Sequence, residues 1–202
     1  MLLPPGACQF ETWLQTSAQQ PAQWLLVPAC NLGGAIEWSV GLGLQKTADG
    51  GRQDQFGLQA KTLFKELVTG SWGWGASLGL SRPLPGSAGR TLAAGTVMLS
   101  LAPSAPLALH LNAGATRGAG QTARANWGAA FEYTLDERWT LVGERYGERH
   151  GRPFTALGVA FWLRPDKLQL DATLGREPRP GGHARCGTLG LAWLWNDALP
   201  AR

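Results

Sequence analysis

Charged residues are scarce in this sequence. Asp, Glu, Lys and Arg together make up 16% of its 202 residues, whereas an ordinary soluble domain has about 25%. So few charges disfavour a soluble cytoplasmic enzyme, because a solvated surface needs them. Glycine and tryptophan are abundant instead, with 28 and 10 residues. This combination is typical of β-rich proteins with tight turns and a membrane interface.

Long apolar runs are also missing. The longest candidate, residues 92–101, is short and is interrupted by Gly95, Thr96 and Ser100. A membrane-spanning helix needs about 18 or more consecutive apolar residues, so this class is excluded. Membrane-spanning strands are not excluded, because such strands need only about ten residues of alternating polarity.

Motifs of common enzymes and metal sites are lacking as well. The sequence has no G-x-S-x-G, no phosphate-binding loop and no H-E-x-x-H. Its cysteines, Cys8, Cys30 and Cys186, form no C-x-x-C pair and have no histidine cluster beside them. We therefore expect no metal site, no cofactor and no enzymatic activity. No basic strip interleaved with aromatic residues is present, so we expect no nucleic-acid partner.

Period-two alternation runs through nearly the whole chain. Ile36, Trp38 and Val40 share one face of a predicted strand, and Glu37 and Ser39 share the other. The same pattern recurs within residues 55–64, 72–80, 107–116, 126–135, 168–175 and 188–195, and more weakly near 8–16, 23–30, 91–101, 138–147 and 153–163. This is the periodicity of strands and not of helices.

Connections between the predicted strands alternate in length. The long ones are 47–53, 81–90, 117–123 and 176–184, and the short ones are 68–71, 102–106, 136–138 and 164–166. We therefore predict a closed antiparallel transmembrane β-barrel of about twelve strands (about 10–12), with short periplasmic turns and longer external loops. It forms a single domain, 1–202, in which 1–7 is an unstructured N-terminal remnant and 197–202 a tail.

The loop pattern also fixes the strand directions. If residues 33–46 run outward, 23–30 run inward and 8–16 run outward, so that Cys8 and Cys30 meet at the periplasmic ends of adjacent strands. This placement predicts a Cys8–Cys30 disulfide, which forms in an oxidising compartment such as the periplasm. Three buried free thiols are the alternative.

Alternation alone does not say which face points outward. The second face is made of Gly, Ala, Ser, Thr and Asn with few charges, whereas a solvated surface is about a quarter to a third charged. Side chains cease to fill a barrel beyond about eight strands, so an apolar lumen would be a wide void. We expect the apolar face to meet lipid. A soluble periplasmic, lipocalin-like binder with an apolar lumen is the alternative.

Aromatic residues fall at two levels under this topology. Those near the predicted periplasmic rim are Trp72, Trp74, Tyr133, Trp139, Trp193 and Trp195. Those near the outer rim are Phe56, Trp127 and Phe154. Amphipathic rings settle at the headgroup level of a bilayer, so we predict two aromatic girdles. Ordinary core packing is the alternative.

Polar residues with inward parity form the predicted lumen lining. They are Glu37, Lys61, His110, Asn112, Glu132, Glu144, Gln169 and Asp171. Such groups either cross-link a narrow lumen through ion pairs or line a polar pore and set its ion preference. The excess of carboxylates predicts a weak preference for cations in an open pore.

Arginine is frequent in the predicted long loops. The residues are Arg52, Arg82, Arg90, Arg117, Arg149, Arg152, Arg176, Arg179 and Arg185. Because guanidinium groups pair well with phosphate, external loops of this kind could bind lipopolysaccharide. An ordinary solvated loop surface is the alternative. The expected partners are membrane lipid, lipopolysaccharide and small-molecule solutes.

One constellation leaves an enzymatic alternative open. His110 and Asn112 share a face, and Ser77 or Ser100 could act as a nucleophile beside them, as serine and histidine do in lipid hydrolases built on barrels. His110 has inward parity, however, and a hydrogen-bonded lumen histidine is the favoured interpretation.

Several segments resemble a family of mostly uncharacterised proteobacterial outer-membrane barrels. They are Leu109–Gly114, Glu132–Leu135, Trp139–Glu144 and Gly158–Gly175, with Gly6–Trp13 and Pro28–Asn31 near the start. Members are labelled putative transporters or putative phenol-degradation pathway proteins. The resemblance implies a Pro165-Asp166 turn between two strands and an inward Asp171. Ala160 stands where an inward Arg is more usual in the family, which implies a wider lumen here.

We therefore expect an outer-membrane channel or passive transporter of small molecules. The family label implies hydrophobic or aromatic solutes among them. The competing functions are a structural or interaction barrel with a blocked lumen, a barrel-borne lipid hydrolase, and the soluble binder described above. Export requires a signal peptide, and residues 1–5 are too short to be one, so we expect that leader to lie outside this sequence.

Overall fold

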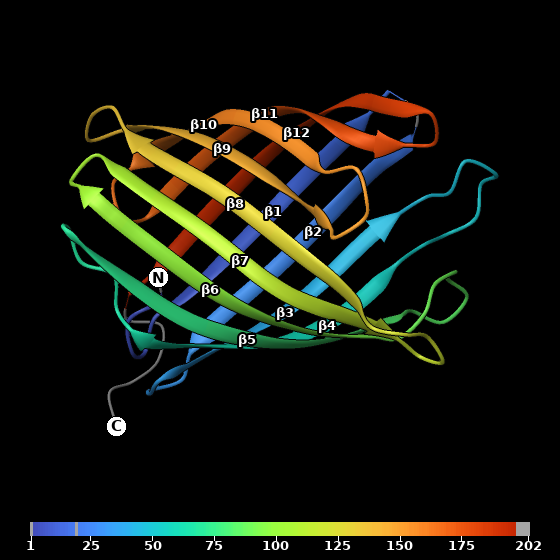
Figure 1. Cartoon of the computed structure of the whole chain (residues 1–202), viewed down its shortest axis with the longest axis horizontal. Coiled ribbons are helices and arrows are strands. Elements are labelled where there is room, and N and C mark those ends of the chain that lie inside the picture. The colour runs from blue at the N-terminus through green and yellow to red at the C-terminus, as the bar shows by residue number, and fades with distance from the viewer. Residues whose placement is uncertain (1, 19, 197–202) are drawn as a thin grey trace.

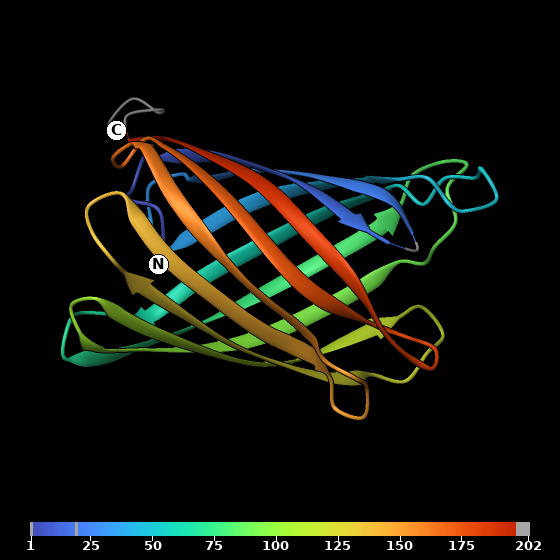
Figure 2. The same ribbon diagram turned by 90° about the horizontal axis from the view of Figure 1, so that it is seen from above.

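The computed structural model describes residues 2–18 and 20–196, and within them twelve strands close into one antiparallel barrel (Figures 1 and 2). The strands are β1 Cys8–Ser17, β2 Gln20–Asn31, β3 Ile36–Gln45, β4 Gln55–Lys65, β5 Ser71–Pro83, β6 Leu92–Ser104, β7 Leu107–Gly118, β8 Arg124–Thr134, β9 Trp139–Glu148, β10 Phe154–Arg164, β11 Leu168–Arg179 and β12 Gly182–Trp195. The predicted fold class is confirmed. The expected tail, 197–202, lies outside the described residues.

Each strand pairs with its neighbours in sequence, and β1 closes the barrel by pairing with β12. That closing ladder runs from Cys8 opposite Trp195 to Ser17 opposite Cys186. A closed ladder leaves no free sheet edge, so each of the twelve strands is hydrogen-bonded to a neighbour on both sides. Within the described part of the chain, no helix is long and apolar enough to cross a membrane.

The two ends of the barrel differ in their connections. The short-turn end carries the turns 105–106, 135–138 and 165–167, together with the start of β1 and the end of β12. The long-loop end carries the loops 46–54 and 84–91. The expected asymmetry of the connections is therefore present.

The prediction of a long loop at residues 176–184 is wrong. β11 and β12 continue through it as a regular ladder, from Arg176 opposite Arg185 to Arg179 opposite Gly182. A tight turn at residues 180–181 joins the two strands, and Gly181 adopts a φ of 80° there, which glycine allows without strain. The polar composition of this segment suggested a loop, but polar residues also occupy strands that extend beyond the apolar belt.

Most large apolar side chains point outward, on strands all around the barrel. Leu174 is 78% exposed, Leu78 70% and Leu189 64%. The inner face instead carries glycine, alanine, serine and the charged residues described below. This arrangement contradicts the alternative of a soluble binder with an apolar lumen, because such a protein would bury these leucines inside.

Small residues on the inner face allow the strands to coil closely. A Cβ added at Gly158 would lie 2.2 Å from the backbone oxygen of Ala172 on β11, whereas a Cβ at Gly41 on β3 would meet nothing within 4 Å. The close approach of β10 to β11 therefore depends on the missing side chain at Gly158.

Gly158→Val is expected to destabilise the folded barrel by about 1–3 kcal/mol, because the backbones of β10 and β11 must separate to admit the side chain. Gly41→Val is the matched control and should have little effect. Urea unfolding of the detergent-folded proteins, followed by tryptophan fluorescence, measures both. Equal midpoints for the two variants would contradict this account of the β10–β11 pair.

Candidate functional site

The structure brings the eight sequence-predicted lumen residues to the inner face in two connected groups. Glu132, Glu144, Gln169 and Asp171 line a cavity of about 300 Å³. Lys61, His110, Asn112 and Glu132 line a second cavity of about 380 Å³. Glu37 is paired with Lys61. Glu132 lines both cavities and so joins the two groups.

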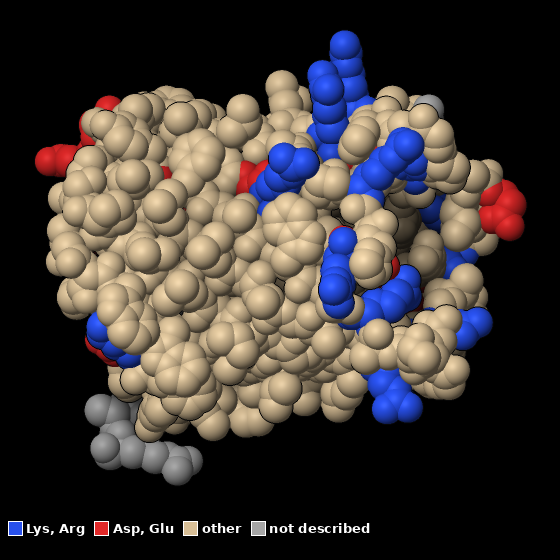
Figure 3. Space-filling model, viewed as in Figure 1, with Lys and Arg blue, Asp and Glu red and all other residues tan. Residues whose placement is uncertain are grey.

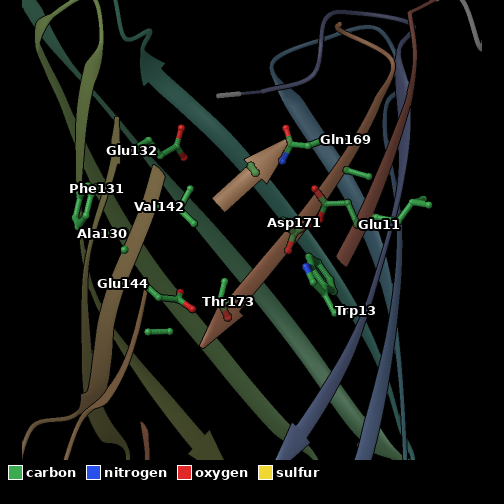
Figure 4. A pocket seen from close by; sticks show the side chains of 15 residues that line it. Glu11, Trp13, Ala130, Phe131, Glu132, Val142, Glu144, Gln169, Asp171 and Thr173 are labelled. Carbon is green, nitrogen blue, oxygen red and sulfur yellow. The ribbon is translucent and has the colours of Figure 1, made fainter. Parts of the chain in front are cut away.

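Carboxylates surround the first cavity, which we call the acidic cavity (Figure 4). Glu11 on β1 and Asp171 on β11 project from one wall, and Glu132 on β8 and Glu144 on β9 project from the other. Among the described residues, no Lys, Arg or His forms an ion pair with Glu11, Glu144 or Asp171. The side-chain amide of Gln9 donates to Glu11 at 3.1 Å.

Alanines keep the acidic cavity open between these carboxylates. Ala160 lies opposite Asp171 on the neighbouring strand, and Ala156 lies opposite Glu144. Both alanines line the cavity and are almost fully buried. Trp13 and Val142 add an apolar side to it. The arrangement provides an anionic compartment with one apolar surface, inside the barrel.

The second cavity contains a serine–histidine hydrogen bond with a carboxylate just beyond hydrogen-bond distance of the histidine. Ser100 and His110 are direct cross-strand partners, and Ser100 Oγ lies 2.8 Å from His110 Nδ1. His110 Nε2 lies 3.6 Å from Glu132 Oε1. Ser77, the other serine considered from the sequence, is buried opposite Lys61 and belongs to a different part of the wall. Only Ser100 is therefore placed to react with His110.

The N-terminal segment, residues 2–7, lies inside the short-turn end of the barrel. Leu3 is 8% exposed and packs with Ala7, Ala29 and Leu194, of which the last two face inward from β2 and β12. The expectation that residues 1–7 are an unstructured remnant is thus wrong for residues 2–7. The segment is ordered because its apolar side chains find a small apolar patch on an otherwise polar inner wall.

Asn31 anchors this segment. Its side-chain amide, 2% exposed, donates to the Leu3 carbonyl at 2.8 Å and accepts from the amides of Gly33 and Gly34 at 3.2 and 3.0 Å. Its backbone pairs with Gly6 and Ala7. The Cys8–Cys30 disulfide holds the next residues of both strands, and the predicted disulfide is confirmed.

The lumen ion pair is tied to the same segment. Glu37 Oε1 lies 2.8 Å from Lys61 Nζ, and Glu37 Oε2 accepts a hydrogen bond from the Leu3 amide at 2.8 Å. Glu37 is 6% exposed, and a buried carboxylate needs both its counter-charge and its donors. The pair therefore connects the N-terminal segment to the wall of the second cavity.

Aromatic residues lie where the sequence placed most of them. Trp72, Trp74, Tyr133, Trp139, Trp193 and Trp195 are all between 38% and 48% exposed, close to the short-turn ends of their strands. Phe56 and Trp127 are also exposed. The placement of Phe154 in an outer girdle is wrong, because it is 7% exposed and stacks on the inward-facing Tyr146 with ring centroids 4.7 Å apart.

Two groups of functional residues were missed from the sequence. Glu11 and Trp13 alternate with Phe10 and Thr12 in a strand whose polarity pattern is weak. This alternation places Glu11 and Trp13 on the same face, and it was the signal by which they could have been found. Asn31 and Leu3 had no local signal, since their importance comes from a chain reversal back into the barrel.

Asn31→Ala is expected to loosen the N-terminal segment, because the Leu3 carbonyl loses its buried donor at a cost of about 1–3 kcal/mol. Hydrogen exchange of the Gly6 and Ala7 amides should accelerate at least about tenfold. Asn112→Ala, which removes an inward-facing amide far from the segment, should leave that exchange unchanged. Equal protection of Gly6 and Ala7 in both variants would argue against anchoring by Asn31.

Solved structures with the same fold are outer-membrane channels. The KdgM porin superposes with a TM-score of 0.72 at 8% identity, over 92% of this chain and 98% of that chain. The NanC porin gives 0.69 at 9% identity, over 92% and 98%. The COG4313 outer membrane channel from Pseudomonas putida F1 gives 0.73 at 12% identity, over 96% and 97%. At these identities the likeness establishes the fold.

Sequence comparison defines the family. Among curated proteins, none matches this chain. Residues 2–182 match the sequence profile of a family described as uncharacterised conserved protein UCP029691. The resemblance to an uncharacterised family of barrels is confirmed to this extent, whereas no comparison shows a phenol-degradation label. Because the match spans most of the sequence, the chain belongs to the family of uncharacterised conserved protein UCP029691.

Proposed function

We propose that the protein is an outer-membrane channel for passive passage of small solutes, with a preference for cations. The observation that carries the proposal is a closed barrel with an apolar outer face and a polar lumen that contains the acidic cavity. The outer-membrane channels that share the fold support it.

The outer face supports placement in a lipid bilayer. Soluble monomers rarely expose contiguous apolar patches larger than roughly a few hundred Å². In this barrel, by contrast, leucines and valines are exposed on strands all around the outer face. The six aromatic residues near the short-turn end fit a bilayer interface. By this orientation the short-turn end faces the periplasm, and the long-loop end faces outward.

The long-loop end is basic. Figure 3 shows Lys and Arg side chains gathered around a hollow at that end, while most of the face over the strands is uncharged. Arg52, Arg124 and Arg179 are paired with Asp54, Glu148 and Glu177. The other exposed arginines there remain available to lipopolysaccharide phosphates, which are the anions expected in the outer leaflet.

Cation preference follows from the charges within the lumen. Lys61 is neutralised by Glu37, and His110 faces Glu132, whereas Glu11, Glu144 and Asp171 have no cationic partner among the described residues. Charges inside a narrow, low-dielectric lumen act on a permeating ion more strongly than solvent-screened charges at the mouth. Trp13 and Val142 in the same cavity suit the small hydrophobic or aromatic solutes implied by the family resemblance.

Planar-bilayer recording in a salt gradient tests the proposal. The wild-type channel should conduct with a cation-to-anion permeability ratio above one, and Glu11→Gln/Glu144→Gln/Asp171→Asn should lower that ratio. Glu66→Gln/Glu137→Gln/Asp166→Asn, which removes the same charge from exposed turns, is the matched control and should keep the wild-type ratio.

Two outcomes would count against this function. Anion selectivity of the wild type would reject the role of the acidic cavity. The absence of any conductance would reject the channel and leave the alternative of a structural or interaction barrel with a blocked lumen. In that case the N-terminal segment inside the short-turn end would be the natural candidate for the block.

A second candidate function is ester hydrolysis in the lumen, and the observation that favours it is the Ser100–His110 hydrogen bond with Glu132 3.6 Å from the other ring nitrogen. His110 would take the proton from Ser100 as its oxygen attacks an ester carbonyl, and would return it to the leaving alcohol; water, deprotonated by His110, would then cleave the acyl-Ser100 ester, release the carboxylic acid and restore the Ser100 hydroxyl. The substrate would have to enter the lumen, because all three side chains face inward.

A fluorophosphonate probe tests this candidate, since such probes label activated serines. Hydrolysis predicts labelling of the folded protein that Ser100→Ala and His110→Ala both abolish, while Ser77→Ala keeps it. If the wild type is not labelled, the Ser100–His110 contact is a structural hydrogen bond across β6 and β7.

A further inference from the structure

Three arginines lie on the outer face near the long-loop end, and two of them are adjacent. Arg176 on β11 and Arg185 on β12 are direct cross-strand partners. Arg145 on β9 and Arg176 both lie opposite Thr155 on the intervening strand β10. Like charges facing each other across a sheet are destabilising. Adjacent arginines on a strand surface therefore need a negatively charged group to neutralise them.

The protein does not supply that counter-charge. Among the described residues, no ion pair involves Arg145, Arg176 or Arg185. The nearest carboxylates in sequence, Glu144 and Glu177, have the opposite parity and point to the inner face, where Glu177 pairs with Arg179. The cluster is therefore open to an anion from outside.

An apolar groove leads away from these arginines. A cavity of about 540 Å³ on the outer face is lined by Thr155, Leu157, Leu174, Arg176 and Arg185 among others. A second cavity, of about 560 Å³, shares Leu157 and Leu174 with the first. It continues toward the middle of the barrel along Leu14, Val159 and Leu189. Together they form one groove with a cationic head and an apolar body.

Gly187 opens the floor of this groove. It lies on β12 between Arg185 and Leu189, with the same outward parity, and also lines the second cavity. A Cβ there would have Leu174 Cδ2 at 3.4 Å and the Thr173 backbone oxygen at 3.5 Å, which are ordinary contacts. The fold therefore tolerates a side chain at this position, but a large one would fill the groove.

We propose that this groove binds one phosphate-bearing lipid, with the phosphate between Arg176 and Arg185 and an acyl chain along Leu157, Leu174 and Leu189. Guanidinium forks match phosphate oxygens in geometry and charge. The apolar part of the groove beneath them fits a hydrocarbon chain, whereas a free phosphate ion has no apolar part that could occupy it. The site rests on the proposed membrane placement, but not on conduction through the lumen.

Charge complementarity favours a lipid over a second copy of this chain. A two-fold contact through the same face would bring Arg176 and Arg185 of both copies together, because such interfaces are self-complementary. That contact would double the uncompensated charge. A lipid phosphate would neutralise the charge of Arg176 and Arg185, and its acyl chain would cover the exposed leucines.

Lipid A is a suitable probe, and native mass spectrometry of the detergent-folded full chain measures its binding. Arg176→Gln/Arg185→Gln should weaken binding at least about tenfold, since two charge-assisted contacts are lost. Arg149→Gln/Arg152→Gln removes the same charge from the 149–153 loop and should weaken binding far less than the Arg176/Arg185 pair does. Gly187→Phe should also weaken binding, whereas Gly95→Phe, at an outward-facing glycine on β6, should not.

Equal weakening by the two arginine pairs would overturn the proposal, because it would reduce the effect to general attraction at a basic rim. Loss of lipid A on addition of inorganic phosphate, with no effect of Gly187→Phe, would replace the lipid site by a simple anion site. Conductance recorded on the same samples separates the two proposals. A protein that binds lipid A as expected but does not conduct keeps the lipid site and loses the channel.

Discussion

Closure of the β1–β12 ladder is the constraint on which the rest of this structure depends. With the ladder closed, every strand has two hydrogen-bonded neighbours, so the backbone needs no water on either face. The two-residue period of the strands then divides the side chains between two environments. Most leucines and tryptophans occupy the outside, and most small and acidic residues occupy the inside. The acidic cavity and the outer groove are consequences of this single division.

Charges inside the barrel are arranged asymmetrically along its axis. Glu37 and Lys61 neutralise each other and hold the Leu3 backbone near the short-turn end. The carboxylates of the acidic cavity beyond them, apart from Glu132, have no cationic partner among the described residues, and Ala160 stands directly opposite Asp171. The N-terminal segment therefore contacts the wall of the lumen through Glu37 and Lys61, and Lys61 also lines the second cavity.

The fold was predictable from the sequence because strand parity and loop length repeat along the chain and reinforce one another. The Cys8–Cys30 disulfide followed from the same topology. Parity places Phe154 on the same inner face as Ala160, so its assignment to the outer girdle went against the two-residue period of β10. Parity could not show that residues 2–7 fold back into the lumen, because that feature arises from contacts between distant segments. The 176–184 region was misread because polarity was taken as a sign of a loop.

The division into an apolar exterior and a polar lumen is most directly tested by electrophoresis of the detergent-folded protein, boiled and unboiled. A closed barrel whose outer face binds detergent should resist unfolding in the unboiled sample and migrate differently from the boiled one. The account predicts such a shift, abolished by boiling. A protein that shows no shift, and that stays soluble in plain buffer, would have its apolar face inside and would contradict the account.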